Sequence, residues 1–423
     1  MNRRLTAIER TFWINGKATS MNFALAVHVQ GDLTLAQLEA ALRAVRKRHP
    51  LLTVAIRPDQ DGWPWYVSEG VPEIPVRVVE GTDPDVWRQE TEDELARSID
   101  WETGPLARFV WVRGNGRSVL IAVAHHVASD GLSVAYLIRD VMTQLGGAAA
   151  DVEPLPALAG PEDLVPPAVS NNLLVRLVTA CLAVLFKLQM RFKKSVFDAD
   201  RPKDAYRLLP WVLTEAQTRV LVDRCREAQT TVHAAICTAF LLSYADLRGG
   251  PRVRRIQSPV SLRQHLVGPV EEAVGLLITI AETRADCAPG RDFWEIARDV
   301  KTGFTRGSAG SRLFLRILTM KRVLRNLAEA DIINNWSDCE VEYDLSVSNL
   351  GRLEIPVRCG PYQIEVIHGP LVNGTRHEQV LGVTTIAGRM SMTFVYRSPT
   401  MHATVAEQIV DGAMQRLGEA VGW

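Results

Sequence analysis

The chain has 423 residues, of which 47% are hydrophobic and 23% charged, a composition ordinary for a globular protein with room for two domains. Lys and Arg together number 48, as do Asp and Glu, so no global field would draw the protein to nucleic acid or an anionic membrane. The six cysteines lack CxxC or Cys/His metal spacing, and no apolar signal core follows Met1. These features predict a cytoplasmic protein with reduced, packed thiols and without a bound metal or cofactor.

Strand-like and helix-like patterns alternate over the first third of the chain, which predicts an α/β or α+β layer domain. The elements expected there are a strand at 22–30, a helix at 35–49 that Thr34 caps and Pro50 stops, a strand at 51–56, a hairpin of strands 105–113 and 118–124, and a helix at 132–145.

Two adjacent histidines end the strand at 118–124, in the sequence His125-His126-Val127-Ala128-Ser129-Asp130-Gly131. The side chains of neighbouring strand residues point to opposite faces of the sheet, so the two imidazoles cannot both face one cavity. One of them should be packed or hydrogen-bonded, and the other is free for chemistry. Asp130 can cap the following helix, and Gly131 suits a tight turn into it, including a turn with positive φ.

The middle of the chain changes in composition. Residues 146–170 are rich in Ala, Gly and Pro, which predicts a linker or a segment crossing a surface. A strongly apolar, helix-like segment follows at 173–190, and its charge-free part, Leu177 to Phe186, is too short to span a bilayer. We expect this segment either to line or lid an apolar channel or to be a plain core helix.

The second half again alternates between strands and helices. The expected elements are strands at 207–213, 255–263, 347–351 and 390–397, and helices at 214–229, 231–244, 293–298 and from 405 onward. The sequence is therefore divided into a first lobe at 1–146, a crossover at 147–205 and a second lobe at 206–423.

The arrangement from His125 to Gly131 resembles the HHxxxDG signature of the condensation-domain superfamily of acyltransferases. The Pro-Val-x-Leu-Arg element that ends at Arg263 and the Arg48-His49 pair also match, although Pro50 replaces an acidic residue, and the resemblance covers nearly the whole chain. It implies two chloramphenicol-acetyltransferase-like α/β lobes with an active-site tunnel between them. The chain is most similar to free-standing polyketide-associated acyltransferases of the phthiocerol dimycocerosyl transferase type.

The resemblance also implies roles for particular residues. His126 would be the general base of a direct acyl transfer from a thioester, His125 would orient or pack, and Gly131 would let the loop approach the cavity. Asp130 would form a structural ion pair with Arg263. The sequence has no GxSxG elbow and no evident nucleophilic cysteine, so a covalent acyl-enzyme is not indicated.

Two further groups of residues are candidates for substrate contacts. Ser348 and Asn349 could stabilise the oxyanion, or the segment around them could simply make a turn. A basic, amphipathic stretch without an acidic residue could dock an acidic acyl carrier protein or the phosphates of coenzyme A, or it could be a solvated helix face. Its basic residues are Arg312, Arg316, Lys321, Arg322 and Arg325.

The sequence therefore predicts an O-acyltransferase that esterifies a hydroxyl of a lipid, polyketide or other natural-product acceptor. The donor would be acyl-coenzyme A or a phosphopantetheinyl acyl carrier protein, and a carrier protein or polyketide synthase is the expected partner. Two alternatives stay open: amide formation with an amine acceptor, and a catalytically silent scaffold that binds carrier proteins.

Overall fold

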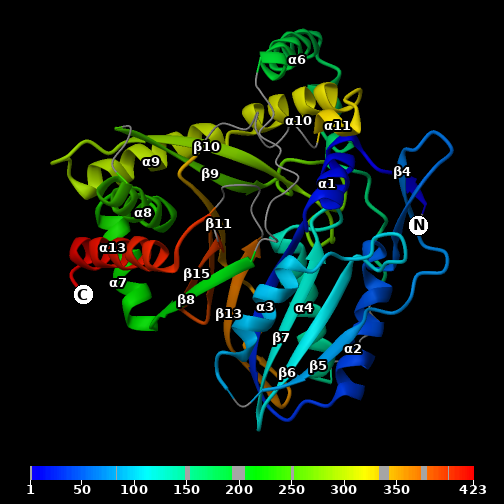
Figure 1. Cartoon of the computed structure of the whole chain (residues 1–423), viewed down its shortest axis with the longest axis horizontal. Helices are drawn as coiled ribbons and strands as arrows, with labels where there is room; N and C mark the ends of the chain where they lie inside the picture. Colours follow the sequence, from blue (N-terminus) through cyan, green and yellow to red (C-terminus); the bar gives the residue numbers. More distant parts are fainter. Residues whose placement is uncertain are drawn as a thin grey trace.

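Two six-stranded sheets, each covered by helices, form the body of the protein in the computed structural model (Figure 1). The structure describes residues 2–81, 83–147, 153–192, 205–248, 252–332, 343–372, 379–398 and 400–423, and for 190–192 and 248 the backbone alone. The predicted fold class, a two-lobed α/β architecture, is confirmed.

The first sheet has the strand order β12-β13-β2-β7-β6-β5. Its strands are β12 (Arg358–Cys359), β13 (Tyr362–Val372), β2 (Asn22–Gln30), β7 (Arg117–His125), β6 (Ala107–Arg113) and β5 (Val76–Glu80). Helices α2 (Leu35–Arg48) and α4 (Gly131–Leu145) cover one face, and α3 (Val86–Ala96) covers the other. Phe23 and Leu25 of β2 pack on the α2 and α4 side, whereas Ala24 packs on the α3 side, so this strand is apolar on both faces.

The second sheet has the order β10-β9-β11-β14-β15-β8. Its strands are β10 (Ile278–Asp286), β9 (Val253–Ser261), β11 (Leu345–Arg352), β14 (Val380–Ile386), β15 (Arg389–Ser398) and β8 (Ala205–Leu213). The helices of this lobe are α7 (Glu215–Glu227), α8 (Val232–Arg248), α9 (Phe293–Gly307), α10 (Gly310–Leu324) and α13 (Ala403–Val421). Its core is built by α8, α13 and the sheet, where Phe240, Phe394 and Ile409 are fully buried.

Shorter elements complete the described chain. These are α1 (Ala7–Ala18), a small sheet of β1 (Arg3–Arg4), β4 (Pro64–Val67) and β3 (Ala55–Pro58), the 3₁₀ turns η1 (Pro50–Thr53) and η2 (Pro161–Asp163), and the helices α5 (Pro167–Ser170), α6 (Leu173–Phe192) and α11 (Glu329–Asp331). The strand predicted at 51–56 was wrong in its first half. Pro50 starts a 3₁₀ turn there, with Thr53 bonded back to the Pro50 carbonyl, and the strand begins at Ala55.

The two halves of the sequence do not map onto the two sheets. Strands β12 and β13 come from the second half of the chain, and β13 pairs antiparallel with β2, with Ile367 opposite Val27. Glu92 of α3 in turn accepts a hydrogen bond from the backbone N–H of Leu208 in β8. A split of the chain into one N-terminal and one C-terminal lobe therefore leaves out that β12 and β13 belong to the first sheet. The helices and strands predicted on either side of the crossover are nevertheless present.

Helix α6 contradicts both interpretations of the apolar segment at 173–190. It is not a core helix, because Leu173, Leu174 and Leu185 are each more than 60% exposed. Nor does any α6 residue line the cavity described below. The apolar sequence of α6 alone could not indicate that α10 lies between α6 and the cavity.

No single helix in the described ranges is both long enough and apolar enough to cross a membrane; α7 and α8 meet the criterion only jointly, with a 96° bend between them. Of the six cysteines, Cys225, Cys237, Cys287 and Cys359 are buried and free, Cys181 is exposed and free, and Cys339 lies outside the described residues.

Candidate active site

The two motif histidines separate at the end of β7 as the strand geometry requires. His125 is 2% exposed, and its Nδ1 accepts a hydrogen bond of 3.1 Å from the backbone N–H of Val127. Burial lowers the pKa of His125 to about 3, with smaller contributions from His126 and Arg108, so its imidazole is neutral near pH 7. A Cβ on Gly16 of α1 would lie 2.7 Å from Nε2 of this ring, so His125 packs tightly against α1.

His126 turns to the opposite side and lines a cavity. Its Nδ1 lies 2.8 Å from the backbone carbonyl oxygen of Ser129. A carbonyl oxygen only accepts, so Nδ1 carries the proton and Nε2 keeps its lone pair. No hydrogen bond within the described part of the chain engages Nε2. Burial lowers the pKa of His126, although the Ser129 carbonyl and Asp130 oppose the shift, and the ring is therefore a neutral base near pH 7.

Aromatic side chains hold the His126 ring in place. The rings of Phe12, from α1, and Phe23, from β2, lie 5.1 and 4.9 Å from the imidazole, measured between ring centroids. Phe12 was not among the site residues expected from the sequence, because no helix was predicted at the position of α1. The signal was present: Thr6 and Glu9 have the spacing of a capping box, and the structure contains both of its hydrogen bonds.

The cavity has a volume of about 400 Å³ and is lined by both lobes. This volume lies within the usual range of small-molecule sites. Its lining is mostly apolar, with Phe12 and Met21 on the first-lobe side and Ile280, Ile317 and Met320 on the second. An apolar space between two lobes with a neutral imidazole in its wall suits a hydrophobic substrate that must lose a proton.

Asp130 and Arg263 form the ion pair that the resemblance implies, and the pair joins the two lobes. Asp130 is fully buried and caps α4: its Oδ1 accepts from the backbone N–H and hydroxyl of Ser133 at 2.8 and 2.9 Å. Its Oδ2 accepts from Arg263 Nη1 at 2.8 Å and from the Leu277 N–H at 3.0 Å. Burial alone would raise the pKa of Asp130, but Arg263 and the Ser133 donors outweigh it and hold the pKa below its ordinary value. The carboxylate is thus fully engaged, and Asp130 does not line the cavity.

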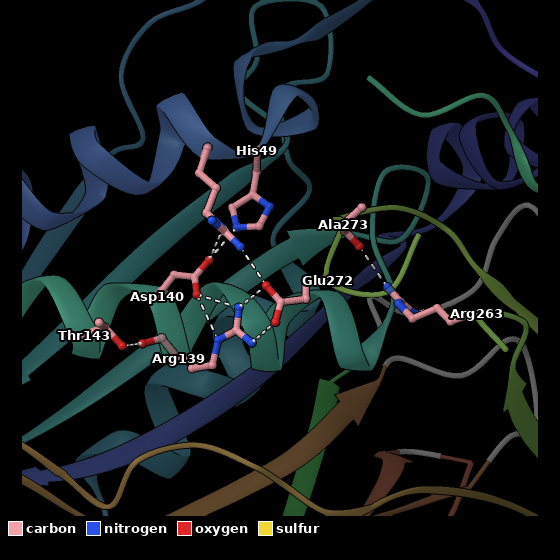
Figure 2. Close-up of polar contacts among 8 residues, drawn as sticks. His49, Arg139, Asp140, Thr143, Arg263, Glu272 and Ala273 are labelled. Carbon is pink, nitrogen blue, oxygen red and sulfur yellow. Dashed lines mark hydrogen bonds and ion pairs between the residues drawn. The ribbon is translucent and has the colours of Figure 1, made fainter. Parts of the chain in front are cut away.

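A second polar network, drawn together with Arg263 in Figure 2, gives the Arg48-His49 element a structural place. Nε2 of the fully buried His49 lies 2.9 Å from the Asp140 carboxylate on α4. The Arg139 guanidinium donates hydrogen bonds to both Asp140 and Glu272, at 2.7 to 3.0 Å. Arg48 also donates to Glu272, at 2.7 Å. Glu272 belongs to the loop between β9 and β10, so the network fastens that loop to α2 and α4.

Gly131 does not provide the positive φ that was considered from the sequence; its role is to leave room for neighbouring side chains. It is the first residue of α4, and it is not among the glycines with positive φ. A Cβ there would lie 2.8 Å from Cδ2 of Leu350 and 3.1 Å from Cγ of Pro370, both of which line the cavity. Close approach of the two lobes, rather than backbone strain, selects glycine.

Ser348 and Asn349 both line the cavity, together with His126. They lie on β11, where Ser348 is opposite Gly382 of β14. The Asn349 side-chain oxygen accepts from the Gly351 N–H at 2.8 Å, which leaves the amide nitrogen as its donor group. The segment is therefore strand with a register shift between Asn349 and Arg352 rather than a simple turn, and it places a hydroxyl and an amide at the cavity. Their role as oxyanion donors stays a prediction.

The predicted docking stretch forms α10, but part of its charge is neutralised within the protein. Arg316 lines the cavity and pairs with Glu282 at 3.0 Å, and Lys321 pairs with Asp163 at 2.6 Å. Arg322 donates to the Thr179 hydroxyl of α6. Arg312 and Arg325 are exposed and have no ion pair within the described part of the chain. Over the same ranges, no cluster of three or more His, Cys, Asp or Glu residues could hold a metal ion.

Two protein-family profiles match the chain in succession. The family described as "Condensation domain" matches residues 11–156, and "Phthiocerol/phthiodiolone dimycocerosyl transferase C-terminus" matches residues 204–396. Among curated relatives, the probable non-canonical nonribosomal peptide synthetase CymA of Salinispora arenicola is 29% identical over 96% of this chain, and the match covers 5% of CymA. The isonitrile lipopeptide synthase of Mycobacterium tuberculosis is 30% identical over 36% of this chain, which is 6% of its length. The chain thus spans a small fraction of these relatives.

Solved structures show the same fold at low identity. The trichothecene 15-O-acetyltransferase TRI3 of Fusarium sporotrichioides superposes with a TM-score of 0.75 at 14% identity, over 99% of this chain and 95% of its own. Polyketide synthase associated protein 5 of Mycobacterium tuberculosis gives 0.65 at 17%, over 99% and 98%. The first condensation domain of the CDA synthetase gives 0.72 at 16%, over 100% and 96%. The family profiles and relatives together support acyl transfer or condensation.

Proposed function

Because this chain belongs to the condensation-domain superfamily of acyltransferases, and is therefore an enzyme that transfers acyl groups, we propose that it esterifies a hydroxyl of a lipid, polyketide or other natural-product acceptor with an acyl group from a thioester. The observation that carries the proposal is that Nε2 of His126 lies in the wall of the apolar cavity between the lobes and is engaged by no hydrogen bond from the residues the structure describes. The similarity to a phthiocerol/phthiodiolone dimycocerosyl transferase family supports a hydroxyl acceptor.

In the proposed reaction His126 acts as general base. Its Nε2 takes the proton of the acceptor hydroxyl while the oxygen attacks the thioester carbonyl carbon, which forms a tetrahedral oxyanion. Ser348 and Asn349 are the proposed donors to that oxyanion. Collapse breaks the carbon–sulfur bond, and the leaving thiolate recovers the proton from His126. Direct transfer of this kind requires that both substrates are bound at once, and it needs no acyl-enzyme.

The proposed donor is an acyl-coenzyme A or an acyl group on a phosphopantetheinyl carrier protein. Of the predicted docking residues, Arg312 and Arg325 are the exposed ones that make neither an ion pair nor a side-chain hydrogen bond in the described ranges, and they are the proposed contacts for phosphate or an acidic carrier. A charge-reversing double variant, Arg312→Glu with Arg325→Glu, should raise KM for the donor and leave kcat little changed. Arg219→Glu, at an exposed arginine of α7, is the control.

Thiol release tests the reaction directly. Acyl-coenzyme A and acyl-carrier thioesters of several lengths are incubated with and without an alcohol acceptor, with wild type, His126→Asn and His402→Asn. Asparagine at 126 can still donate to the Ser129 carbonyl but is no base, and His402 is an exposed histidine outside the site. We expect acceptor-dependent release that falls roughly 10²- to 10⁴-fold in His126→Asn and is unchanged in His402→Asn.

The same assay separates the alternatives. The relationship to nonribosomal peptide synthetases keeps amide formation as a second candidate, and faster release with an amine than with its matched alcohol would favour it. Release that persists at the wild-type rate in His126→Asn would show that the base is misassigned. Carrier binding without release from any thioester would instead favour the silent scaffold.

A further inference from the structure

Helix α6 lies on the outside of the protein, beyond both sheets, and rests on α10 (Figure 1). Its inner face is narrow. Thr179 and Ala183 are buried there, with the Thr179 hydroxyl accepting from Arg322 and Ala183 packing on Val323 of α10. These contacts fix which side of the helix turns outward.

The outward side of α6 is apolar. Eight large aliphatic side chains are exposed on this one helix: Leu173, Leu174, Leu177, Val178, Leu182, Val184, Leu185 and Leu188. Leu177 and Leu185 are 57% and 62% exposed and project roughly opposite the buried Thr179 and Ala183. A surface helix ordinarily turns its polar face to water, so this reversal marks an interaction surface.

The charged residues in and next to α6 in the sequence are all of one sign. The sequence from 164 to 197 contains no acidic residue and five basic ones: Arg176, Lys187, Arg191, Lys193 and Lys194. Within the described part of α6, Arg176 and Lys187 are eleven residues apart, about three helical turns, so they lie on the same flank beside the apolar face. An apolar face with a basic flank is complementary to the acyl chains and phosphates of anionic lipid.

We propose that α6 is an interfacial helix that lies in the surface of an anionic lipid membrane, with its exposed leucines among the acyl chains. A second copy of this chain is a poorer occupant, because a symmetric contact would bring two sets of basic residues together. The inner face of α6, which packs on α10, keeps the helix parallel to the protein surface. The helix therefore lies in the membrane interface rather than crossing the membrane.

The position of α6 links the membrane to the cavity. Helix α10 lies between them: Val323 contacts α6, while Ile317 and Met320 line the cavity. A docked α6 would therefore hold the cavity wall about one helix diameter, roughly 10 Å, from the lipid. Membrane binding by α6 does not depend on the reaction proposed above, but it would bring a lipid acceptor close to His126.

Vesicle flotation tests the proposal. The purified chain is mixed with vesicles of phosphatidylcholine alone or of equimolar phosphatidylcholine and phosphatidylglycerol. We expect it to float with the anionic vesicles and to bind the neutral ones far more weakly. Leu177→Asn with Leu185→Asn should lower the bound fraction at least roughly tenfold, because two apolar side chains leave the lipid. Leu35→Asn with Leu247→Asn changes two exposed leucines elsewhere and should bind as wild type does.

Two results would overturn the proposal. The first is no flotation of wild type with anionic vesicles. The second is a wild-type dimer in solution that Leu177→Asn with Leu185→Asn converts to a monomer, which would assign the apolar face to a second copy. Turnover of a water-soluble donor and acceptor by the Leu177/Leu185 variant, measured in parallel, shows that the site is intact and separates failure of this proposal from failure of the proposed function.

Discussion

The buried Asp130–Arg263 pair should contribute strongly to stability, because its two members come from different lobes and neither can be solvated. Arg263 and Asp130 are 5% and 0% exposed in their side chains. Asp130→Ala would leave the guanidinium unpaired, at about 3–5 kcal/mol. It would also remove the N-cap of α4, at about 1 kcal/mol. The expected loss is therefore about 4–6 kcal/mol, enough to unfold many proteins.

A milder variant keeps the test measurable. Asp130→Asn retains the shape and the cap but removes the charge, so we expect a loss of about 1.5–3 kcal/mol in the free energy of unfolding. Urea unfolding followed by circular dichroism measures it. In the double variant with Arg263→Met the loss should be smaller than the sum of the two single losses, because no charge is left buried alone.

The matched control is Asp286→Asn, which breaks an Arg–Asp pair whose arginine, Arg252, is 68% exposed. This loss should be far smaller, because water already screens the pair. Equal losses from Asp130→Asn and Asp286→Asn would refute the reasoning. The pH dependence gives a second check: the pKa of Asp130 is lowered by folding, so its stabilisation is present above the ordinary pKa near ~3.9 and is lost as pH falls through the lowered value. Asp130→Asn should lack that part of the acid unfolding.

Three further predictions concern the cavity. The acid limb of the rate–pH profile should lie below pH ~6.5, because burial lowers the pKa of His126 and the rate falls only when the ring is protonated; a limb above that value would contradict the assigned base. Gly131→Ala should cost about 1–3 kcal/mol in thermal unfolding and raise KM for long donors, because its Cβ pushes Leu350 into the cavity; an unchanged KM would show that Leu350 moves elsewhere. Met320→Trp should shift the preference in competition assays toward shorter acyl chains, whereas Met414→Trp, at a residue that does not line the cavity, should not.

The local elements and the motif that marks the site can be predicted from the amino-acid sequence alone. Apolar, β-prone runs predicted β2 and the β6–β7 hairpin, and the Thr34 cap predicted the start of α2, because strand propensity, turn residues and capping act over a few neighbouring residues. The opposite orientation of His125 and His126 followed from the two-residue period of a strand. The resemblance carried by HHxxxDG supplied the partner of Asp130, which lies 133 residues away.

Tertiary structure decided what depends on contacts between distant segments. Pairing of β13 with β2 joins the two halves of the chain, and no local pattern encodes which edge a strand selects. Gly131 is small because Leu350 of the second sheet and Pro370 of β13 approach it, and both are more than 200 residues away in the sequence, so its own neighbourhood in sequence cannot reveal them. The apolar sequence of α6 likewise does not indicate on which side of α10 the helix packs. The sequence of a hydrophobic helix indicates only that its apolar side chains should be shielded from water. The tertiary structure determines whether the rest of the protein or an external partner shields them.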